Sequence, residues 1–110
     1  MGKFYLNRKK YGKSFLYFEK AAMQGHIKSQ NILGYLYEEG KGVLKNFQNA
    51  IIWYRRSAYQ GYAYAQYNLA GMYYNGKGTE QNYEQAYKWY KKAAEQGIQE
   101  AKDILKQNVT

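Results

Sequence analysis

The sequence contains no cysteine and no proline, and it has no long run of apolar residues. Without cysteine the chain forms no disulfide and carries no thiolate for metal binding or catalysis. The lack of proline fits a chain of uninterrupted helices that end at glycine. No apolar stretch approaches the roughly 20 residues that a membrane-spanning helix requires. The N-terminus also lacks the apolar core of a signal peptide, which favours a cytoplasmic protein, although an exported form whose signal has been removed stays compatible.

Residues that commonly carry catalysis are also scarce. His26 is the single histidine and Asp103 is the single aspartate. A zinc site needs several clustered ligands, and a hydrolytic dyad or triad needs a base held by a second group. We therefore expect no catalytic residues, no metal, no cofactor and no enzymatic activity. His26 is interpreted as a residue at a helix start, and Glu38 with Glu39 as a surface pair at a helix end.

Acidic residues are few, and the formal net charge is +9. Residues 1–60 hold 11 basic and 3 acidic side chains, a net charge of +8, whereas residues 61–110 hold 6 and 5, a net charge of +1. Such a basic half attracts nucleic acid, an anionic lipid surface or an acidic protein, but it is equally typical of a surface that only keeps a protein soluble. The basic cluster consists of Arg8, Lys9, Lys10, Lys13, Arg55 and Arg56.

The sequence repeats itself with a period of 36 residues, set by Gly25, Gly61 and Gly97. A period of this size indicates a solenoid, in which each unit buries its apolar face only by stacking on its neighbours. Equivalent positions hold a small pair before each glycine, an aromatic pair further upstream and a leucine downstream. These sets are Ala21-Ala22, Ser57-Ala58 and Ala93-Ala94; Tyr17-Phe18, Trp53-Tyr54 and Trp89-Tyr90; and Leu33, Leu69 and Leu105.

Each repeat is predicted to form two helices. Helical spacing places Phe47, Ala50, Trp53, Tyr54, Ser57 and Ala58 on one packed stripe, and Gln48, Arg55, Arg56 and Tyr59 away from it. Gly61 is expected to supply the left-handed turn that ends this helix, and Asn82 to cap a later one. The expected helices cover residues 12–24, 27–39, 47–60, 63–75, 83–96 and 98–108. The fold class is thus all-α: an α/α superhelix, or solenoid, of antiparallel helix pairs with about six helices.

The repeat register divides the chain into a basic N-terminal segment, residues 1–10, and a repeat domain, residues 11–110. The domain comprises a lone helix 11–25, a repeat 26–61, a repeat 62–97 and a capping helix 98–110. Tyr17 and Phe18 are expected in the core, Leu16 at an outer position, and residues 4–6 folded over this end. Because an apolar end without a neighbour favours self-association, we also expect a homodimer through the N-terminal helix, residues 4–18.

Two stretches of the sequence resemble the Sel-one-like repeat family, a relative of the tetratricopeptide repeats. The first holds Ser29-Gln30, Leu33-Gly34, Tyr37, Gly40-Lys41-Gly42, Asn46, Ala50, Trp53-Tyr54 and Ser57-Ala58 up to Gly61. The second holds Ala65-Gln66, Leu69-Ala70, Tyr73, Gly76-Lys77-Gly78, Asn82, Ala86, Trp89-Tyr90 and Ala93-Ala94 up to Gly97. The resemblance implies a non-catalytic adaptor for a partner protein or peptide, with a host-interaction or toxin-neutralising (immunity) role.

The surface of the first helix in each repeat suggests where a partner would bind. Positions opposite the packed stripe hold Lys28, Asn31, Tyr35 and Glu38, then Tyr64, Tyr67, Gly71 and Tyr74. In related solenoids the first helices line the concave face, and tyrosine is enriched at binding hot spots. A partner-binding groove at Lys28, Asn31, Tyr35, Tyr64, Tyr67 and Tyr74, assisted by Arg55 and Arg56, is our favoured hypothesis. Tyr67 and Tyr74 can also be ordinary packing residues.

The alternative hypothesis is a basic module that binds nucleic acid or an anionic surface. Nucleic-acid binding is less favoured, because most tyrosines are needed for packing and few remain to stack on bases. The two hypotheses differ in salt dependence: binding dominated by phosphate contacts collapses as ionic strength rises. An interface centred on tyrosine should lose mainly association rate.

Overall fold

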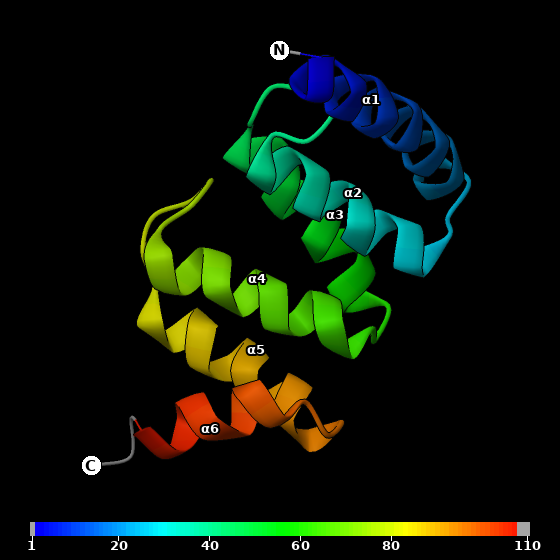
Figure 1. Ribbon diagram of the computed structural model, residues 1–110. Coiled ribbons are helices and arrows are strands. Elements are labelled where there is room, and N and C mark those ends of the chain that lie inside the picture. The colour runs from blue at the N-terminus through cyan, green and yellow to red at the C-terminus, as the bar shows by residue number, and fades with distance from the viewer. Residues whose placement is uncertain (1, 108–110) are drawn as a thin grey trace.

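The computed structural model describes the backbone of residues 2–107 and the side chains of residues 11–107. Within that part every regular element is a helix (Figure 1). The helices are α1 (Gly2–Met23), α2 (Ile27–Glu39), α3 (Phe47–Tyr59), α4 (Ala63–Asn75), α5 (Tyr83–Glu95) and α6 (Gln99–Gln107). The all-α solenoid of about six helices is therefore confirmed, and α2 to α6 begin and end within one residue of the expected positions. None of the described helices is both long and apolar enough to cross a membrane.

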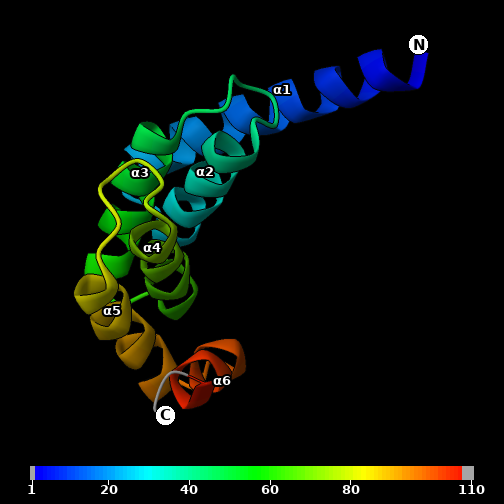
Figure 2. The same ribbon diagram turned by 90° about the vertical axis from the view of Figure 1, so that its left-hand side faces the viewer.

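Helix α1 differs from the expectation, because it begins at Gly2 rather than near residue 12. The expected basic segment 1–10 thus continues the helix and does not fold over the end of the stack, as Figure 2 shows. The repeat pattern begins at residue 11, so it does not predict a helix before that residue. Residues 3–11 nevertheless favour a helix, because lysine, arginine and leucine are good helix formers and neither proline nor glycine interrupts them. The side chains of residues 1–10 lie outside the described residues.

The helix ends follow the capping residues of the sequence. Asn46 and Asn82 accept hydrogen bonds from the backbone N–H groups of Asn49 and Gln85, each at 3.0 Å. His26 caps α2 in the same way through Nδ1 and Ser29 N–H at 3.3 Å, as its interpretation as a helix-start residue predicted. Gly61 has a φ of +94°, which an L-residue rarely adopts, so a glycine is needed at this turn.

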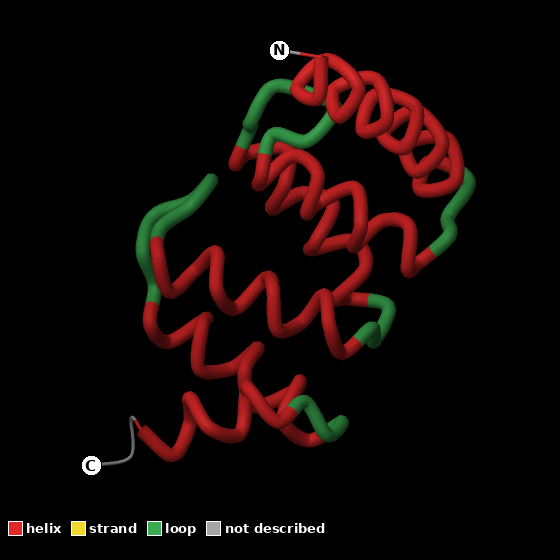
Figure 3. The backbone as a smooth tube through the Cα atoms, in the orientation of Figure 1, coloured by secondary structure: helices red, strands yellow, loops and turns green. Residues whose placement is uncertain are grey.

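Consecutive helices pack against each other in chain order, which gives a curved stack (Figures 2 and 3). The long axis of the molecule is 49 Å, against 31 and 24 Å in the other directions. Helices α2, α4 and α6 lie on the inner side of the curve, and α3 and α5 lie on the outer side (Figure 2). The expected concave first helices are therefore in place.

Small residues allow the helices of one repeat to approach closely. A Cβ atom built on Gly34 would lie 2.7 Å from the ring of Tyr54, so only glycine fits against this ring without a shift. The core residues of α3 are those expected from the packed stripe, except that Phe47 is half-buried and Ile51, which was not expected, is buried. Ile51 occupies the position of Phe15 in α1, which is also buried.

Tyr17 does not lie in the core, contrary to the expectation from its counterparts. Its side chain is 69% exposed, whereas Trp53 and Trp89 are 9% and 3% exposed. Trp53 is covered by Phe15 and Ala22 of α1 and by Leu33 and Leu36 of α2. No helix pair precedes α1 among the described residues, so Tyr17 lacks both of the surfaces that cover a tryptophan in the later repeats.

Candidate partner-binding site

The expected groove residues belong to α2 and α4, the helices on the inner side of the stack (Figure 2). Tyr64 is 56% exposed and contacts the ring of Tyr62, with centroids 5.7 Å apart. Lys28 and Tyr35 are exposed and Asn31 is half-buried. The side chain of Asn68 donates a hydrogen bond to Asn31 Oδ1 at 3.0 Å and so ties α4 to α2. The two helices therefore present one joint surface, which we call the inner face.

Two of the predicted tyrosines also pack against neighbouring helices. Tyr67 is half-buried, and its ring meets the edge of Tyr90 at 5.7 Å between centroids. Tyr74 is exposed on one side and meets Tyr83 at 5.1 Å. Both readings of these residues are thus compatible with the structure, since each ring packs and still has a surface open to a partner.

Tyr35 has a basic neighbour that the sequence did not reveal. Lys41 Nζ donates a hydrogen bond to the Tyr35 hydroxyl at 2.9 Å and lies 5.0 Å from the centre of the ring. The hydrogen bond raises the pKa of Lys41. The N-terminal part of the inner face therefore carries a fixed positive charge beside an exposed phenol ring.

An apolar cavity lies beside Tyr74, between α4, α5 and α6. It has a volume of about 340 Å³, and its lining residues are Tyr74, Tyr83, Ala86, Tyr87, Tyr90 and Leu105. This is at the lower end of the sizes that bind small ligands, and it would hold an apolar side chain of a partner. Helical spacing and the repeat pattern predict no site role for Tyr83, Tyr87, Tyr90 or Leu105. The only signal for them was the excess of 15 tyrosines.

The hydroxyl of Tyr90 sets this cavity apart from the equivalent region of the preceding repeat. There, Tyr54 donates a hydrogen bond to Glu38 at 2.7 Å. The residue at the position of Glu38 one repeat later is Tyr74, and within the described residues no hydrogen bond to the Tyr90 hydroxyl is found. Burial, followed by the neighbouring phenols of Tyr67 and Tyr74, raises the pKa of Tyr90 to about 12. At neutral pH this hydroxyl is therefore a neutral donor beside the cavity.

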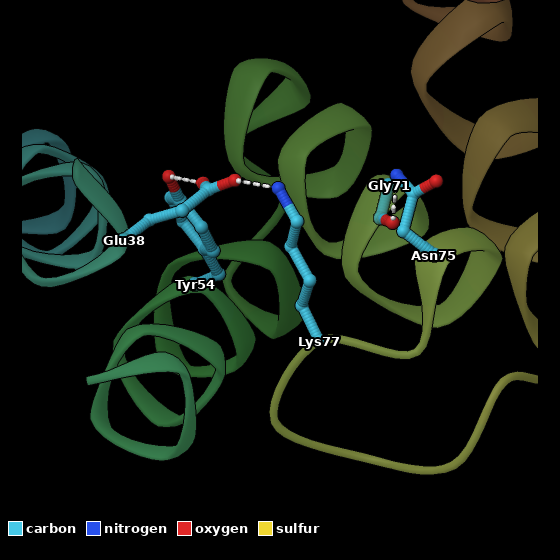
Figure 4. A network of polar contacts seen from close by, with 5 residues as sticks. All are labelled: Glu38, Tyr54, Gly71, Asn75 and Lys77. Carbon is cyan, nitrogen blue, oxygen red and sulfur yellow. Dashed lines mark hydrogen bonds and ion pairs between the residues drawn. The ribbon is translucent and has the colours of Figure 1, made fainter. Parts of the chain in front are cut away.

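Glu38 proves to be more than one member of a surface pair. Its carboxylate accepts from Tyr54 and also meets Lys77 Nζ at 3.5 Å, which joins α2, α3 and the turn after α4 (Figure 4). Burial and then the bond to Glu38 raise the pKa of Tyr54. The expectation that Glu38 only forms a surface pair with Glu39 is therefore wrong. The 36-residue pattern does not show that the hydroxyl of a tyrosine of α3 lies next to this carboxylate.

Arg55 and Arg56 are not on the helices that form the inner face. Both belong to α3, on the outer side of the stack (Figure 2). Arg55 donates to the Tyr73 hydroxyl at 3.0 Å, and the guanidinium of Arg56 lies 4.6 Å from the centre of the Trp53 ring. The structure thus does not bring the two arginines together with Tyr64, Tyr67 and Tyr74, although they remain part of the basic half.

The described residues hold no group of three or more histidines, cysteines or carboxylates that could bind a metal ion. Arg8, Lys9 and Lys10 of the basic cluster lie outside the residues whose side chains are described, and Lys13 is exposed on α1. What the arrangement offers chemically is a curved, tyrosine-rich and basic surface with one apolar cavity. Such a surface offers apolar burial and hydrogen bonds to a bound partner.

Comparison with known proteins gives a consistent picture. The family model described as the Sel1 repeat matches residues 1–26, 27–62 and 63–98. Similar solved structures include c5321, described as a protective antigen present in uropathogenic Escherichia coli strains and displaying an SLR fold, at 35% identity and a TM-score of 0.82. A Sel1 repeat protein from Oxalobacter formigenes is 43% identical with a TM-score of 0.80. Helicobacter pylori cysteine rich protein B is 32% identical with a TM-score of 0.78.

These similarities cover 83% of this chain for c5321 and 84% for the other two. The chain spans only 20% of c5321 and 38% of the Oxalobacter protein, but 69% of the Helicobacter protein. No curated protein matches the chain.

Proposed function

The chain belongs to the Sel1 repeat family, whose members are generally scaffolds for protein–protein interaction, and from this premise we propose that it binds a partner protein or peptide on its inner face. The partner lies across α2 and α4 and contacts Lys28, Asn31, Tyr35, Tyr64, Tyr67 and Tyr74. An apolar side chain of the partner enters the cavity beside Tyr74. The chain itself catalyses no reaction and needs no cofactor.

The observation that carries this proposal is the continuity between exposed tyrosines and the apolar cavity. Tyr64 and Tyr74 are exposed on α4, and Tyr74 also lines the cavity of about 340 Å³. Tyrosine and a well-defined pocket at the centre of an interface are the usual sources of binding energy in protein complexes. The neutral Tyr90 hydroxyl would donate to a backbone carbonyl of the bound segment.

Charge favours an acidic partner segment. Residues 1–60 carry a net charge of +8, and Lys41 is held beside Tyr35 on the inner face. A host-interaction or toxin-neutralising (immunity) role would suit such a binding surface. The description of c5321 as a protective antigen applies to that protein.

A basic surface that binds nucleic acid or anionic lipid is the alternative. It rests on the basic half of the chain, including Arg55 and Arg56 on the outer side. A second copy of the chain, bound through α1, is the alternative partner, because Leu16 and Tyr17 are exposed there.

The test is capture of the partner from the native cell with the tagged chain, followed by titration of the purified pair at low and high salt. Binding to the inner face should survive high salt with little loss of affinity, and Tyr64→Ala should weaken it. Affinity that falls steeply with the logarithm of salt concentration, and that ignores Tyr64→Ala, would establish the basic-surface alternative instead.

A further inference from the structure

In each later repeat the second helix packs against the first helix of the same repeat, as α3 does on α2. Helix α1 corresponds to a second helix, and the side that would contact the first helix of its repeat is not covered by any described element. We call this side the N-terminal face and define it by Tyr17, Phe18, Ala21 and Gln24. Tyr17 and Gln24 are exposed, and Phe18 and Ala21 are half-buried. No described element covers this face.

The later repeats show what this face is built to hold. In α3 the counterpart of Phe18 is Tyr54, which packs against Gly34 of α2. The counterpart of Gln24 is Gln60, whose side-chain amide donates to Gln30 Oε1 at 2.9 Å.

The same hydrogen bond recurs one repeat later, so the glutamine contact is a regular feature of the stack. Gln96 Nε2 donates to Gln66 Oε1 at 2.9 Å. Gln30 and Gln66 in turn donate to the carbonyls of Ala22 and Ala58, at 3.2 and 3.3 Å. Gln24 is the member of this series for which the described helices offer no equivalent glutamine acceptor.

A cavity lies at the place that corresponds to the first turn of such a first helix. It has a volume of about 350 Å³, and its lining residues are Tyr17, Ala21, Gln24, Gly25, His26 and Ser29. In the next repeat the counterparts of Ala21 and Gln24 are Ser57 and Gln60. Ser57 Oγ donates to the carbonyl of Ile27 at 2.9 Å, so the first turn of α2 fills the equivalent place.

We propose that the N-terminal face binds, in trans, a helix of another helical repeat protein that has the pattern of α2 and α4. The pattern is a glutamine, a leucine three positions later and a glycine or alanine four positions later, as in Gln30, Leu33, Gly34 and in Gln66, Leu69, Ala70. The glutamine accepts from Gln24, the small residue packs on Phe18, and the leucine covers Tyr17. This site is separate from the inner face and does not depend on the function proposed for it.

Charge complementarity indicates that the outer side of this bound helix is acidic. Lys13 and Lys20 are exposed on α1, and residues 1–60 carry a net charge of +8. A helix with glutamate on its solvent side would therefore be attracted to the face, whereas a basic helix would be repelled.

The same geometry disfavours α6 of a second copy as the occupant. Helix α6 has Lys102 at the position of Gln30 and Lys106 at the position of Gly34. A lysine ammonium offers no acceptor to Gln24. At the other position α2 and α4 carry a glycine or an alanine, and the long lysine side chain would meet the aromatic ring that packs there. Two lysines would also approach an already basic end.

The experiment uses the full chain and a fluorescein-labelled synthetic peptide with the sequence of residues 62–76, which contains Gln66, Leu69 and Ala70. The control peptide carries Gln66→Lys and Ala70→Lys, which give it the residues of α6. Binding is followed by fluorescence anisotropy. The chain variants are Tyr17→Ala and Gln24→Ala, and the matched controls are Tyr59→Ala and Gln48→Ala on α3, both exposed.

We expect weak, saturable binding of the first peptide, because a short isolated helix is only marginally formed in water. Gln24→Ala should weaken binding about fivefold and Tyr17→Ala about tenfold, the effects of one hydrogen bond and one buried ring. The two control variants and the wild type should bind equally, and the double-lysine peptide should not bind. All variants should keep the helical circular dichroism of the wild type, since the four side chains are exposed.

Three results would overturn the proposal. The first is no saturable binding up to about 1 mM peptide. The second is equal binding of the two peptides, or an equal effect of Tyr17→Ala and Tyr59→Ala, because the peptide would then bind elsewhere or exchange with α4. The third is sedimentation of the chain as a dimer through α1 that the peptide does not displace, because a second copy would then occupy the face.

Discussion

The hydroxyl of Tyr54 donates a hydrogen bond to Oε1 of Glu38 across the interface of α3 and α2, at 2.7 Å. The other carboxylate oxygen of Glu38 meets Lys77 Nζ at 3.5 Å, so three segments of the chain converge on one carboxylate (Figure 4). In the next repeat Tyr74 stands at the position of Glu38, so the equivalent hydroxyl of Tyr90 has no carboxylate at that position. In one repeat the tyrosine hydroxyl therefore forms a hydrogen bond that stabilises the fold. In the next repeat the equivalent tyrosine lines a cavity.

The first prediction compares these two tyrosines. Tyr54→Phe should lower the free energy of unfolding by about 1.5–3 kcal/mol, because it removes a hydrogen bond to a charged group. Tyr90→Phe should change it by less than about 0.5 kcal/mol, since no such bond is lost. Urea unfolding followed by circular dichroism at pH 7 measures both. Equal effects of the two substitutions would contradict the different roles of the hydroxyls.

The second prediction concerns alkaline pH. The pKa of Tyr90 in the folded protein is about 12, above the value of 10.0 for an unperturbed tyrosine. As the pH rises past 10, Tyr90 ionises in the unfolded chain before it does so in the folded chain, so the unfolded state is favoured. The stability contributed by the neutral phenol is thus complete below pH 10 and is lost as the pH approaches 12.

Its measurement is the free energy of unfolding of the wild type and of Tyr90→Phe at several pH values from 8 to about 12. The other tyrosines titrate in both proteins, so the difference between the two isolates Tyr90. We expect the wild type to lose more stability than the variant above pH 10. Parallel curves over the whole range would show that the folded pKa of Tyr90 is not raised.

The third prediction uses the contrast between Trp53 and Tyr17. Trp53→Ala should cost about 3–5 kcal/mol, the usual effect of removing a large buried aromatic side chain. A small domain has only about 5–15 kcal/mol in total, so this variant should be largely or partly unfolded at 37 °C. Tyr17→Ala is the matched control at the equivalent, exposed position and should melt within a few degrees of the wild type. A Trp53→Ala protein that melts like the wild type would refute the packing described for α3.

Most of the fold could be predicted because the helix caps, the glycine turns and most of the buried positions recur at the same places in the 36-residue period. Gly61 and Asn82 act as expected, since turn and cap chemistry depends on neighbouring residues alone. The repeat pattern predicts the wrong environment for Tyr17, and the reason is the opposite one. A counterpart in sequence is buried only where a neighbouring repeat covers it, and this is a property of the stack rather than of the residue.

The candidate site could be predicted only in part. The outward positions of Tyr64 and Tyr74 follow from helical spacing, and both are exposed. Arg55 and Arg56 were grouped with them by charge, but charge along a sequence does not tell which side of a curved stack it occupies. The cavity beside Tyr74 arises from α4, α5 and α6 together, so no single repeat predicts it.

The fourth prediction tests the inner face. Tyr64→Ala should weaken binding of the captured partner by about 2 kcal/mol or more, roughly 30-fold, if Tyr64 is a hot spot. Its folding should hardly change, because the side chain is more than half exposed. Tyr67→Ala should weaken binding as well, but it should also lower the melting temperature, since Tyr67 packs on Tyr90. Tyr17→Ala is the control for loss of an exposed tyrosine elsewhere, and it should bind this partner normally.

The fifth prediction concerns the arginines of the outer side. If the partner binds on the inner face, Arg56→Glu should slow association severalfold at low salt and leave the dissociation rate unchanged, because a distant exposed charge steers but makes no contact. The difference should disappear at high salt, where charges further apart than about 3–8 Å are screened. Lys88→Glu, a matched reversal at an exposed position of α5, should behave in the same way.

Arg55→Glu is less suitable, since it also removes the hydrogen bond to Tyr73. Surface plasmon resonance at two ionic strengths gives both rates. If Arg56→Glu abolishes binding while Tyr64→Ala has no effect, the partner binds the basic outer side and the inner-face proposal fails.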